Sequence, residues 1–262
     1  MEIARNPNLT FREIFAEFFS GLSYNFFDGF VLLLLANSLA TNFSSSLLGV
    51  GLFTSMQWMH AGYSACHFNP IITIACLLSK NISATKAGVY ILAQFLGCYV
   101  GSLMLLFYIP TNFEEMVEGA NVEAGCPHLN PELSPFCGFF IEFLGGLVLT
   151  LVFMFVYNNK NLKNYTPCIA AVYGTFKMTG NDISGATLNP FRFFGAAFVS
   201  FAFDDFYVYL LAPILGSIIA VFLYKFLKIE DEEEDGVEFP DNNSEMNQDL
   251  ISNTEGSKLK GE

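Results

Sequence analysis

The chain has 262 residues, of which 53% are hydrophobic and only 14% are charged. Because soluble domains carry about 25% charged residues, this composition argues against a soluble globular enzyme. The 30 phenylalanines exclude disorder over most of the length. The formal net charge of −13 disfavours nucleic acid as a partner, since phosphate binding requires clustered Lys and Arg. We therefore expect an integral membrane protein.

Six apolar stretches, separated by turn signals and charges, predict transmembrane helices. Their continuous runs of Phe, Leu, Ile and Gly are typical of spanning helices, whereas the strands of a membrane barrel would alternate in polarity. The second and fifth stretches are short for a bilayer, and each is followed by a weakly apolar piece that begins with Asn-Pro. The six stretches lie near residues 12–36, 46–63, 85–109, 134–157, 165–180 and 206–228.

Basic residues alternate along this series of stretches. Lys and Arg precede the first stretch, follow the sixth, and occur between the second and third and between the fourth and fifth, whereas loops 37–45 and 110–133 contain none. By the positive-inside rule, both termini are cytoplasmic and an even number of helices crosses the membrane. Only Lys177 and Arg192 break this pattern. The sequence leaves open whether the host is the plasma membrane or an intracellular membrane such as that of a vacuole.

The two halves of the apolar region resemble each other. Each half contains three spans, so the second half is expected to sit inverted in the membrane, and inverted repeats place a permeation site near the midplane. We expect one repeat over about 12–109 and the other over about 134–228. Three markers recur in the same order: Phe15–Gly21 corresponds to Phe140–Gly146, His67–Ile71 to Thr187–Phe191, and Gln94–Gly97 to Pro213–Gly216.

Asn69-Pro70 and Asn189-Pro190 each predict the start of a short helix, near 69–79 and 189–200. Asn is a favoured N-cap, and Pro is favoured in the first turn, where its missing N–H costs nothing. Inverted symmetry makes the two N-termini meet, and each carries roughly half a positive charge from its helix dipole. A cation is repelled there, whereas the oxygen of water or a polyol can accept hydrogen bonds from the two Asn amides.

The motifs around these positions resemble those of the aquaporin, or major intrinsic protein, family. The resemblance covers residues 12 to about 228. It implies an all-α membrane protein with six transmembrane helices and two half-helices in an inverted three-plus-three repeat, a pore through each protomer, and a homotetramer. The matching motifs are Ala16-Glu17-Phe18, Ser64 to Pro70, Ala93 to Gly97, and Ser184 to Arg192.

The resemblance also implies a selectivity filter at the outer constriction. Arg192 stands where the family places an Arg after the second Asn-Pro motif, and a charge in a spanning region is costly enough to make a functional role the default. Two further positions depend on where gaps fall, and both alternatives stay open for each. The filter positions are Arg192, Ala186, Lys177 or Met178, and Val50 or Gly49.

Several residues depart from the family pattern. Ile71 and Phe191 replace the Ala of the two Asn-Pro-Ala motifs and add bulk beside the central constriction. Phe193 stands where glycerol-conducting members typically carry Asp, which favours water. Against this, small residues at Val50 and Ala186 would leave a wider mouth for larger neutral solutes.

Four further residues are expected to support or line the pore. The resemblance implies that Glu17 and Glu142 accept hydrogen bonds from the loops that hold the half-helices, as buried carboxylates require. His67 and Cys66 precede the first Asn-Pro, and we expect them in the cytoplasmic half of the pore. No other His stands at ligand spacing, so no metal site is expected. Asp28 shares an inward face with Glu17 but has no assigned role.

Residues 229–262 differ completely from the preceding chain. Six consecutive acidic residues, Glu230 to Asp235, open this segment, and such runs are usually solvated and disordered. We expect a cytoplasmic N-terminus over 1–11, a channel domain over 12–228 and an acidic cytoplasmic tail over 229–262. The alternative for the tail is a regulatory segment with Ser252 or Thr254 as phosphorylation sites.

The sequence thus predicts a passive transmembrane channel for water, with small neutral solutes as a further permeant class, that excludes ions and protons. No catalytic residue, cofactor or metal is expected, and the partners are the permeant, the lipid bilayer and further copies of the chain. One alternative is an aquaglyceroporin-type channel for glycerol, urea or ammonia. Another is a non-conducting membrane protein with an adhesion or signalling role, its pore occluded by Ile71, Phe191 and Lys177.

Overall fold

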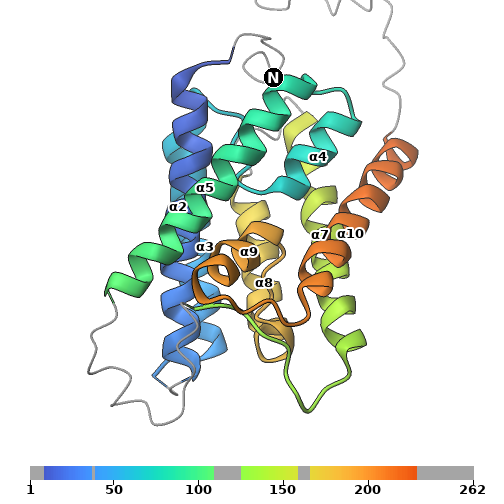
Figure 1. Cartoon of the computed structure of the whole chain (residues 1–262). Helices are drawn as coiled ribbons and strands as arrows, with labels where there is room; N and C mark the ends of the chain where they lie inside the picture. Colours follow the sequence, from blue (N-terminus) through green and yellow to red (C-terminus); the bar gives the residue numbers. More distant parts are fainter. Residues whose placement is uncertain (1–8, 37–38, 109–124, 159–165, 229–262) are drawn as a thin grey trace, which may run out of the picture. The chain divides into compact units, whose positions relative to one another are not determined.

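The computed structural model describes residues 9–36, 39–108, 125–158 and 166–228. These ranges contain eight α-helices and no strand (Figure 1). The chain divides into one unit up to Leu227 and a second from Lys228 onwards. The prediction of an acidic tail over 229–262 therefore concerns residues outside the described ranges, and so does most of the cytoplasmic N-terminus predicted over 1–11.

Six of the helices are long, as the six apolar stretches predict. Four are long and apolar enough to cross a membrane, namely the first, third, fourth and sixth of the series. The other two have 19 residues each and are more polar, which explains why their stretches read as short. The long helices are α2 (Phe11–Ala36), α3 (Asn42–His60), α5 (Ala84–Tyr108), α7 (Pro135–Asn158), α8 (Thr166–Ser184) and α10 (Phe206–Leu227).

Large apolar side chains cover the outer surface of these helices. Phe107 is 85% exposed and Phe226 is 83% exposed, and many other Phe and Leu side chains of the long helices are also exposed. A soluble monomer rarely carries so much exposed apolar surface. Lipid contact accounts for it.

The two short helices, α4 (Pro70–Leu78) and α9 (Pro190–Ser200), begin at the two Asn-Pro motifs as predicted. The side-chain oxygen of Asn69 accepts a hydrogen bond from the N–H of Ile71 at 3.1 Å, and that of Asn189 accepts one from the N–H of Phe191 at 2.9 Å. Both Asn residues have extended backbone, and a Pro follows each in the first turn. These are the conformations that N-capping requires.

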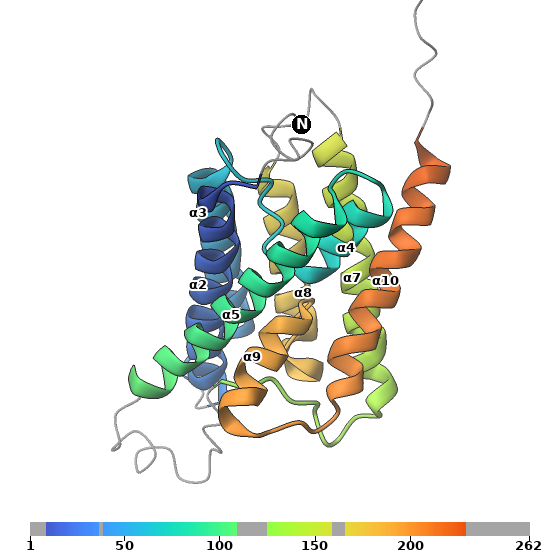
Figure 2. The same ribbon diagram turned by 45° about the horizontal axis from the view of Figure 1, so that its top comes forward.

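The long helices form two closely packed pairs, α2 with α5 and α7 with α10, which lie on opposite sides of the view (Figure 1, Figure 2). Glycines permit the close approach in both pairs. A Cβ at Gly97 would collide with the carbonyl oxygen of Phe18, and a Cβ at Gly216 would collide with that of Phe143. Because Phe18 and Phe143 follow Glu17 and Glu142 directly, the same crossing occurs in each repeat.

The two short helices lie between the pairs and interlock the repeats. In both views α4 and α9 occupy the middle, displaced toward opposite ends of the bundle (Figure 2). Helix α9 packs against α5, and α4 packs against α10. Each short helix therefore contacts the last long helix of the other repeat, which fixes where the two Asn-Pro motifs meet.

Candidate functional site

The centre of the site is the point where the two short helices meet. The amide nitrogen of Asn69 donates to the carbonyl oxygen of Leu188 at 2.8 Å, and that of Asn189 donates to the carbonyl of Phe68 at 3.4 Å. Each Asn thus caps its own helix through its oxygen and reaches across to the loop of the other repeat through its nitrogen. Because a side-chain amide carries two N–H groups, one N–H group on each Asn is left over by these hydrogen bonds.

The two loops that lead into the short helices have unusual backbone conformations. Cys66 and Phe68 in the first loop, and Ala186 and Leu188 in the second, all have φ between +42° and +56°. Residues with a Cβ rarely adopt this left-handed region, and surrounding structure must hold them there.

Glu17 of α2 holds the first loop. Its carboxylate accepts hydrogen bonds from the N–H groups of His67 at 3.1 Å and Phe68 at 2.7 Å. It also accepts from the hydroxyl of Ser64 at 3.2 Å and the amide of Gln94 at 2.7 Å. Four donors therefore surround one fully buried carboxylate.

Glu142 of α7 holds the second loop with the same chemistry. It accepts from the N–H groups of Thr187 at 2.8 Å and Leu188 at 2.7 Å. The hydroxyls of Ser184 and Thr187 complete the set, at 2.8 and 2.9 Å. The two carboxylates lie in the positions that the internal repeat indicates, and each contacts the loop of its own repeat.

The larger residues after the Asn-Pro motifs pack against neighbouring helices. Ile71 is fully buried in the largest apolar cluster, and its carbonyl oxygen accepts a hydrogen bond from Ser217 of α10 at 2.8 Å. The ring of Phe191 lies edge-on to the ring of Phe95 of α5, with centroids 5.5 Å apart. Packing between helices thus accommodates the bulk that these residues add.

His67 and Cys66 lie beside the first short helix. Nδ1 of His67 is 3.2 Å from the hydroxyl of Thr73, and the ring lies edge-on to Tyr90. Nε2 of His67 is buried with no hydrogen-bond partner in the described part of the chain. The thiol of Cys66 lies 3.5 Å from the carbonyl of Ser64, within its own loop. The described residues contain no group of three His, Cys, Asp or Glu side chains placed to hold a metal ion.

At one end of the site, three charged side chains from three different helices converge. Nζ of Lys177 (α8) lies 2.8 Å from both carboxylate oxygens of Asp28 (α2). Nε of Arg192 (α9) donates to Asp28 Oδ2 at 2.7 Å. The exposed fractions are 7% for Asp28, 1% for Lys177 and 0% for Arg192. We call these three residues the charge cluster.

Backbone carbonyls complete the bonding of the two cations. Lys177 donates to the carbonyl of Gly185 at 2.7 Å, and Nη2 of Arg192 donates to that of Gly125 at 2.8 Å. Nη1 of Arg192 is buried and has no hydrogen-bond partner among the described residues. The two N–H groups of Nη1 are therefore left without a partner among the described residues.

The other residues that the sequence predicts for the filter differ in whether they are buried or exposed. Met178 is 51% exposed, whereas Lys177 is buried, so the structure turns Lys177 inward. Ala186 is fully buried in the second loop. Gly49 faces a ring, because a Cβ there would lie 3.4 Å from Cε1 of Tyr173. Val50 packs instead against the backbone of Gly174.

Sequence reasoning did not assign Asp28 or Tyr173 to the site. Asp28 had a usable signal, because a carboxylate in a spanning helix needs a partner, and Lys177 and Arg192 were the two basic residues that break the charge pattern of the loops. Tyr173 lies one helical turn from Lys177, with its ring centroid 5.7 Å from Nζ. Nothing in the sequence distinguishes this tyrosine from an ordinary packing residue.

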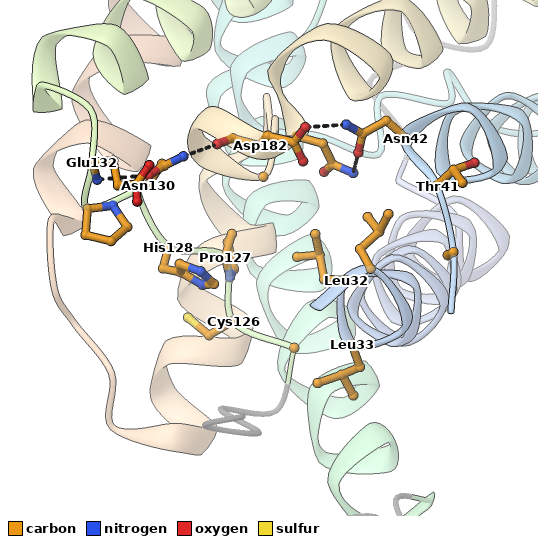
Figure 3. A pocket seen from close by; sticks show the side chains of 16 residues that line it. Leu32, Leu33, Thr41, Asn42, Cys126, Pro127, His128, Asn130, Glu132 and Asp182 are labelled. Carbon is orange, nitrogen blue, oxygen red and sulfur yellow. Dashed lines mark hydrogen bonds between the residues drawn. The ribbon is translucent and has the colours of Figure 1, made fainter. Parts of the chain in front are cut away.

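A cavity of about 810 Å³ opens at the end of the site where the charge cluster lies, and Figure 3 shows side chains that line it. We call it the vestibule. Its wall includes Gly125 and Gly185, whose carbonyls bind the two cations. Its other described lining residues include the carboxylates of Glu132 and Asp182 but no Lys or Arg. Figure 3 shows Asp182 held by Asn42, whose amide donates to Asp182 Oδ2 at 2.6 Å.

The chain is similar in sequence to several known proteins. The family model described as "Major intrinsic protein" matches residues 4–224. "Aquaporin A" of Dictyostelium discoideum is 30% identical over 231 residues, which cover 84% of this chain and 80% of that protein. "Probable aquaporin TIP-type" of Medicago truncatula is 31% identical and covers 86% of each chain.

A solved structure confirms the fold expected from the sequence. The X-ray structure of the aquaglyceroporin from Plasmodium falciparum superposes with a TM-score of 0.67, covering 82% of this chain and 96% of that one. The sequence identity is 24%. The expected arrangement of six long helices and two short ones is therefore observed.

Proposed function

Because this chain belongs to the major intrinsic protein family and is therefore an integral membrane channel rather than an enzyme, we propose that it conducts water and excludes ions and protons. The meeting of two Asn-capped half-helices, each with a donor left over, carries this proposal. Channels of this family transport water or small solutes across a membrane, and conduction here is passive.

The central constriction discriminates against cations by its dipoles. Two helix N-termini, each with roughly half a positive charge, face each other at Asn69 and Asn189. A water molecule presents its oxygen to the two free amide N–H groups, and its hydrogens point away on either side. Because this oxygen already accepts from the two Asn amides, it cannot accept a hydrogen bond from a neighbouring water, and a continuous chain of proton transfers is interrupted there.

The charge cluster forms the second constriction. Arg192 offers Nη1 to the oxygen of a permeating molecule. Lys177 takes the neighbouring filter position, and Tyr173 lies one turn earlier on α8, beside Gly49. The long Lys and Arg side chains narrow this passage, which favours water over larger solutes.

Glycerol, urea or ammonia form the second candidate group of permeants. The small side chain at Ala186 favours this alternative, because it leaves room at one filter position. The ring of Phe193 stacks on Tyr209 at 4.4 Å and is turned toward α10. A Phe side chain has no polar group to bind the hydroxyls of a polyol. This is the reason for ranking water first.

We place both termini on the cytoplasmic side and the vestibule on the opposite side, following the distribution of Lys and Arg between the loops. The family resemblance supports a homotetramer with one pore per protomer. The host membrane is the plasma membrane or an intracellular membrane, and the charge pattern is compatible with either.

Purified protein in liposomes tests the proposal. Under an inward sucrose gradient, the vesicles should shrink several times faster than protein-free vesicles of the same lipid. Under a glycerol gradient they should shrink equally fast but reswell only slowly, at the rate of the bare lipid. Fast reswelling would favour the glycerol-type channel, and shrinkage at the protein-free rate would favour the non-conducting alternative.

A further inference from the structure

Asp28 is a charged residue of the charge cluster that belongs to neither Asn-Pro motif. Asp28 comes from α2, in the first repeat, while Lys177 and Arg192 belong to the second. Both cations contact the same carboxylate, at 2.7 to 2.8 Å. Within the described residues, Lys177 and Arg192 have no other ion-pair partner.

We propose that Asp28 sets the electrostatic selectivity of the filter, and that Lys177 is needed because Asp28 cancels one of the two positive charges. This inference rests on the proposed channel function and concerns how that channel rejects cations. The charge cluster contains one carboxylate and two cations, so its net charge is one positive unit. Without Lys177, the Asp28–Arg192 pair would be neutral.

The hydrogen bonds show which member acts through contact and which through charge. Lys177 uses its three N–H groups on the two oxygens of Asp28 and on the carbonyl of Gly185. It therefore has no donor left for a permeating molecule. Arg192 retains Nη1. Lys177 is thus a positioning and electrostatic residue, whereas Arg192 is the residue that contacts the permeant.

Burial makes the charge of the cluster effective. All three side chains are at least 93% buried, and charges in such surroundings are screened less than charges at a surface. The vestibule above the cluster carries Glu132 and Asp182 among its lining residues and no Lys or Arg. Cations are therefore drawn toward the mouth by the vestibule, and the net charge of the cluster is the barrier that stops them.

Three variants separate charge from shape: K177M, K177R and the double variant D28N/K177M. Native protein and K177R have a cluster charge of +1, K177M has 0, and D28N/K177M returns to +1 with the same Met at position 177. The Asn at position 28 still offers an oxygen to Nε of Arg192. Because D28N alone would leave two buried cations without a counter-charge, it is not used.

The readout is the leak of Na⁺ and H⁺ into proteoliposomes, divided by the water permeability of the same vesicles. We expect K177M to leak roughly tenfold more than native protein, since one unit charge a few ångströms from the pathway is worth more than the energy of a tenfold change at an effective dielectric constant near 20. K177R and D28N/K177M should leak as little as native protein.

A double variant that leaks as much as K177M would overturn the inference, because the shape of position 177 would then decide the leak. K177M that excludes ions like native protein would overturn it as well. Native protein without water permeability would instead refute the proposed function. Single-peak elution in detergent establishes that each variant is folded.

Discussion

The two repeats are alike at the centre of the molecule and unlike at the charge cluster. Glu17 and Glu142 each accept four hydrogen bonds, and three of the donors are equivalent: a serine hydroxyl and two backbone N–H groups. The fourth donor is the Gln94 amide for Glu17 and the Thr187 hydroxyl for Glu142. Asp28 lies eleven residues after Glu17, and the residue eleven after Glu142 is Phe153, whose ring lies against His67.

The same contrast holds on the short helices. Arg192 lies three residues after Asn189, and the residue three after Asn69 is Ile72, which is buried in the apolar cluster. One end of the site therefore carries three charges. Phe153 and Ile72, which are equivalent in the repeat to Asp28 and Arg192, carry none. The symmetric part of the molecule builds the meeting point of the two short helices, and the asymmetric part places three charged side chains at one end of the site.

The largest effect is expected from removing a carboxylate that holds a loop. Glu142→Ala would leave two backbone N–H groups and two hydroxyls unpaired in the interior, at about 1–3 kcal/mol for each buried donor that finds no other partner. We expect most of the protein to aggregate on extraction, and thermal unfolding of the remainder in detergent to begin well below that of native protein.

Glu17→Ala should be as damaging as Glu142→Ala, because the two carboxylates have the same number of donors. Glu142→Gln is the matched control, since the amide keeps one acceptor oxygen, and it should be milder than Glu142→Ala. If one carboxylate proved dispensable while the other was essential, the two loops would not be equivalent.

A smaller loss of stability is expected from adding a methyl group where two helices cross closely. Gly97→Ala and Gly216→Ala would each place a Cβ against a backbone carbonyl of the partner helix. Overpacking of this kind costs about 1–3 kcal/mol, and the two variants should lower the unfolding temperature by similar amounts.

Gly88→Ala provides the control on the same helix as Gly97. A Cβ there meets no atom within 4 Å, and Ala is the better helix former by about 1 kcal/mol. This variant should be as stable as native protein or more so. A loss of stability in Gly88→Ala equal to that in Gly97→Ala would remove close packing as the explanation.

The smallest effect on stability is expected at the helix caps. Asn69→Ala and Asn189→Ala should each cost about 1 kcal/mol through the lost N-cap. Water permeability should fall in both variants, since each loses a donor at the constriction. Unchanged permeability with normal expression would show that the two amides do not contact the permeant.

The sequence was sufficient to predict the parts of the molecule that obey local rules. The caps at Asn69 and Asn189 follow from residue preferences, and the positions of Glu17 and Glu142 follow from the repeat. The helix boundaries at the two short spans shifted by up to four residues, with α3 beginning at Asn42 and α8 ending at Ser184.

The sequence was insufficient where three elements meet. A gap of one residue decides between Lys177 and Met178, and no local pattern fixes that gap. The structure settles the direction of each side chain, because burial separates the two residues. The partner of Lys177 lies 149 residues away on α2, and a pairing over that distance depends on how the helices pack.

Water permeability measured together with ion leak, on one batch of native proteoliposomes, tests the central claim most directly. The account predicts rapid shrinkage in sucrose with a weaker temperature dependence than that of protein-free vesicles, and a leak of Na⁺ and H⁺ no greater than theirs. Shrinkage at the protein-free rate, or rapid shrinkage accompanied by a large ion leak, would contradict it.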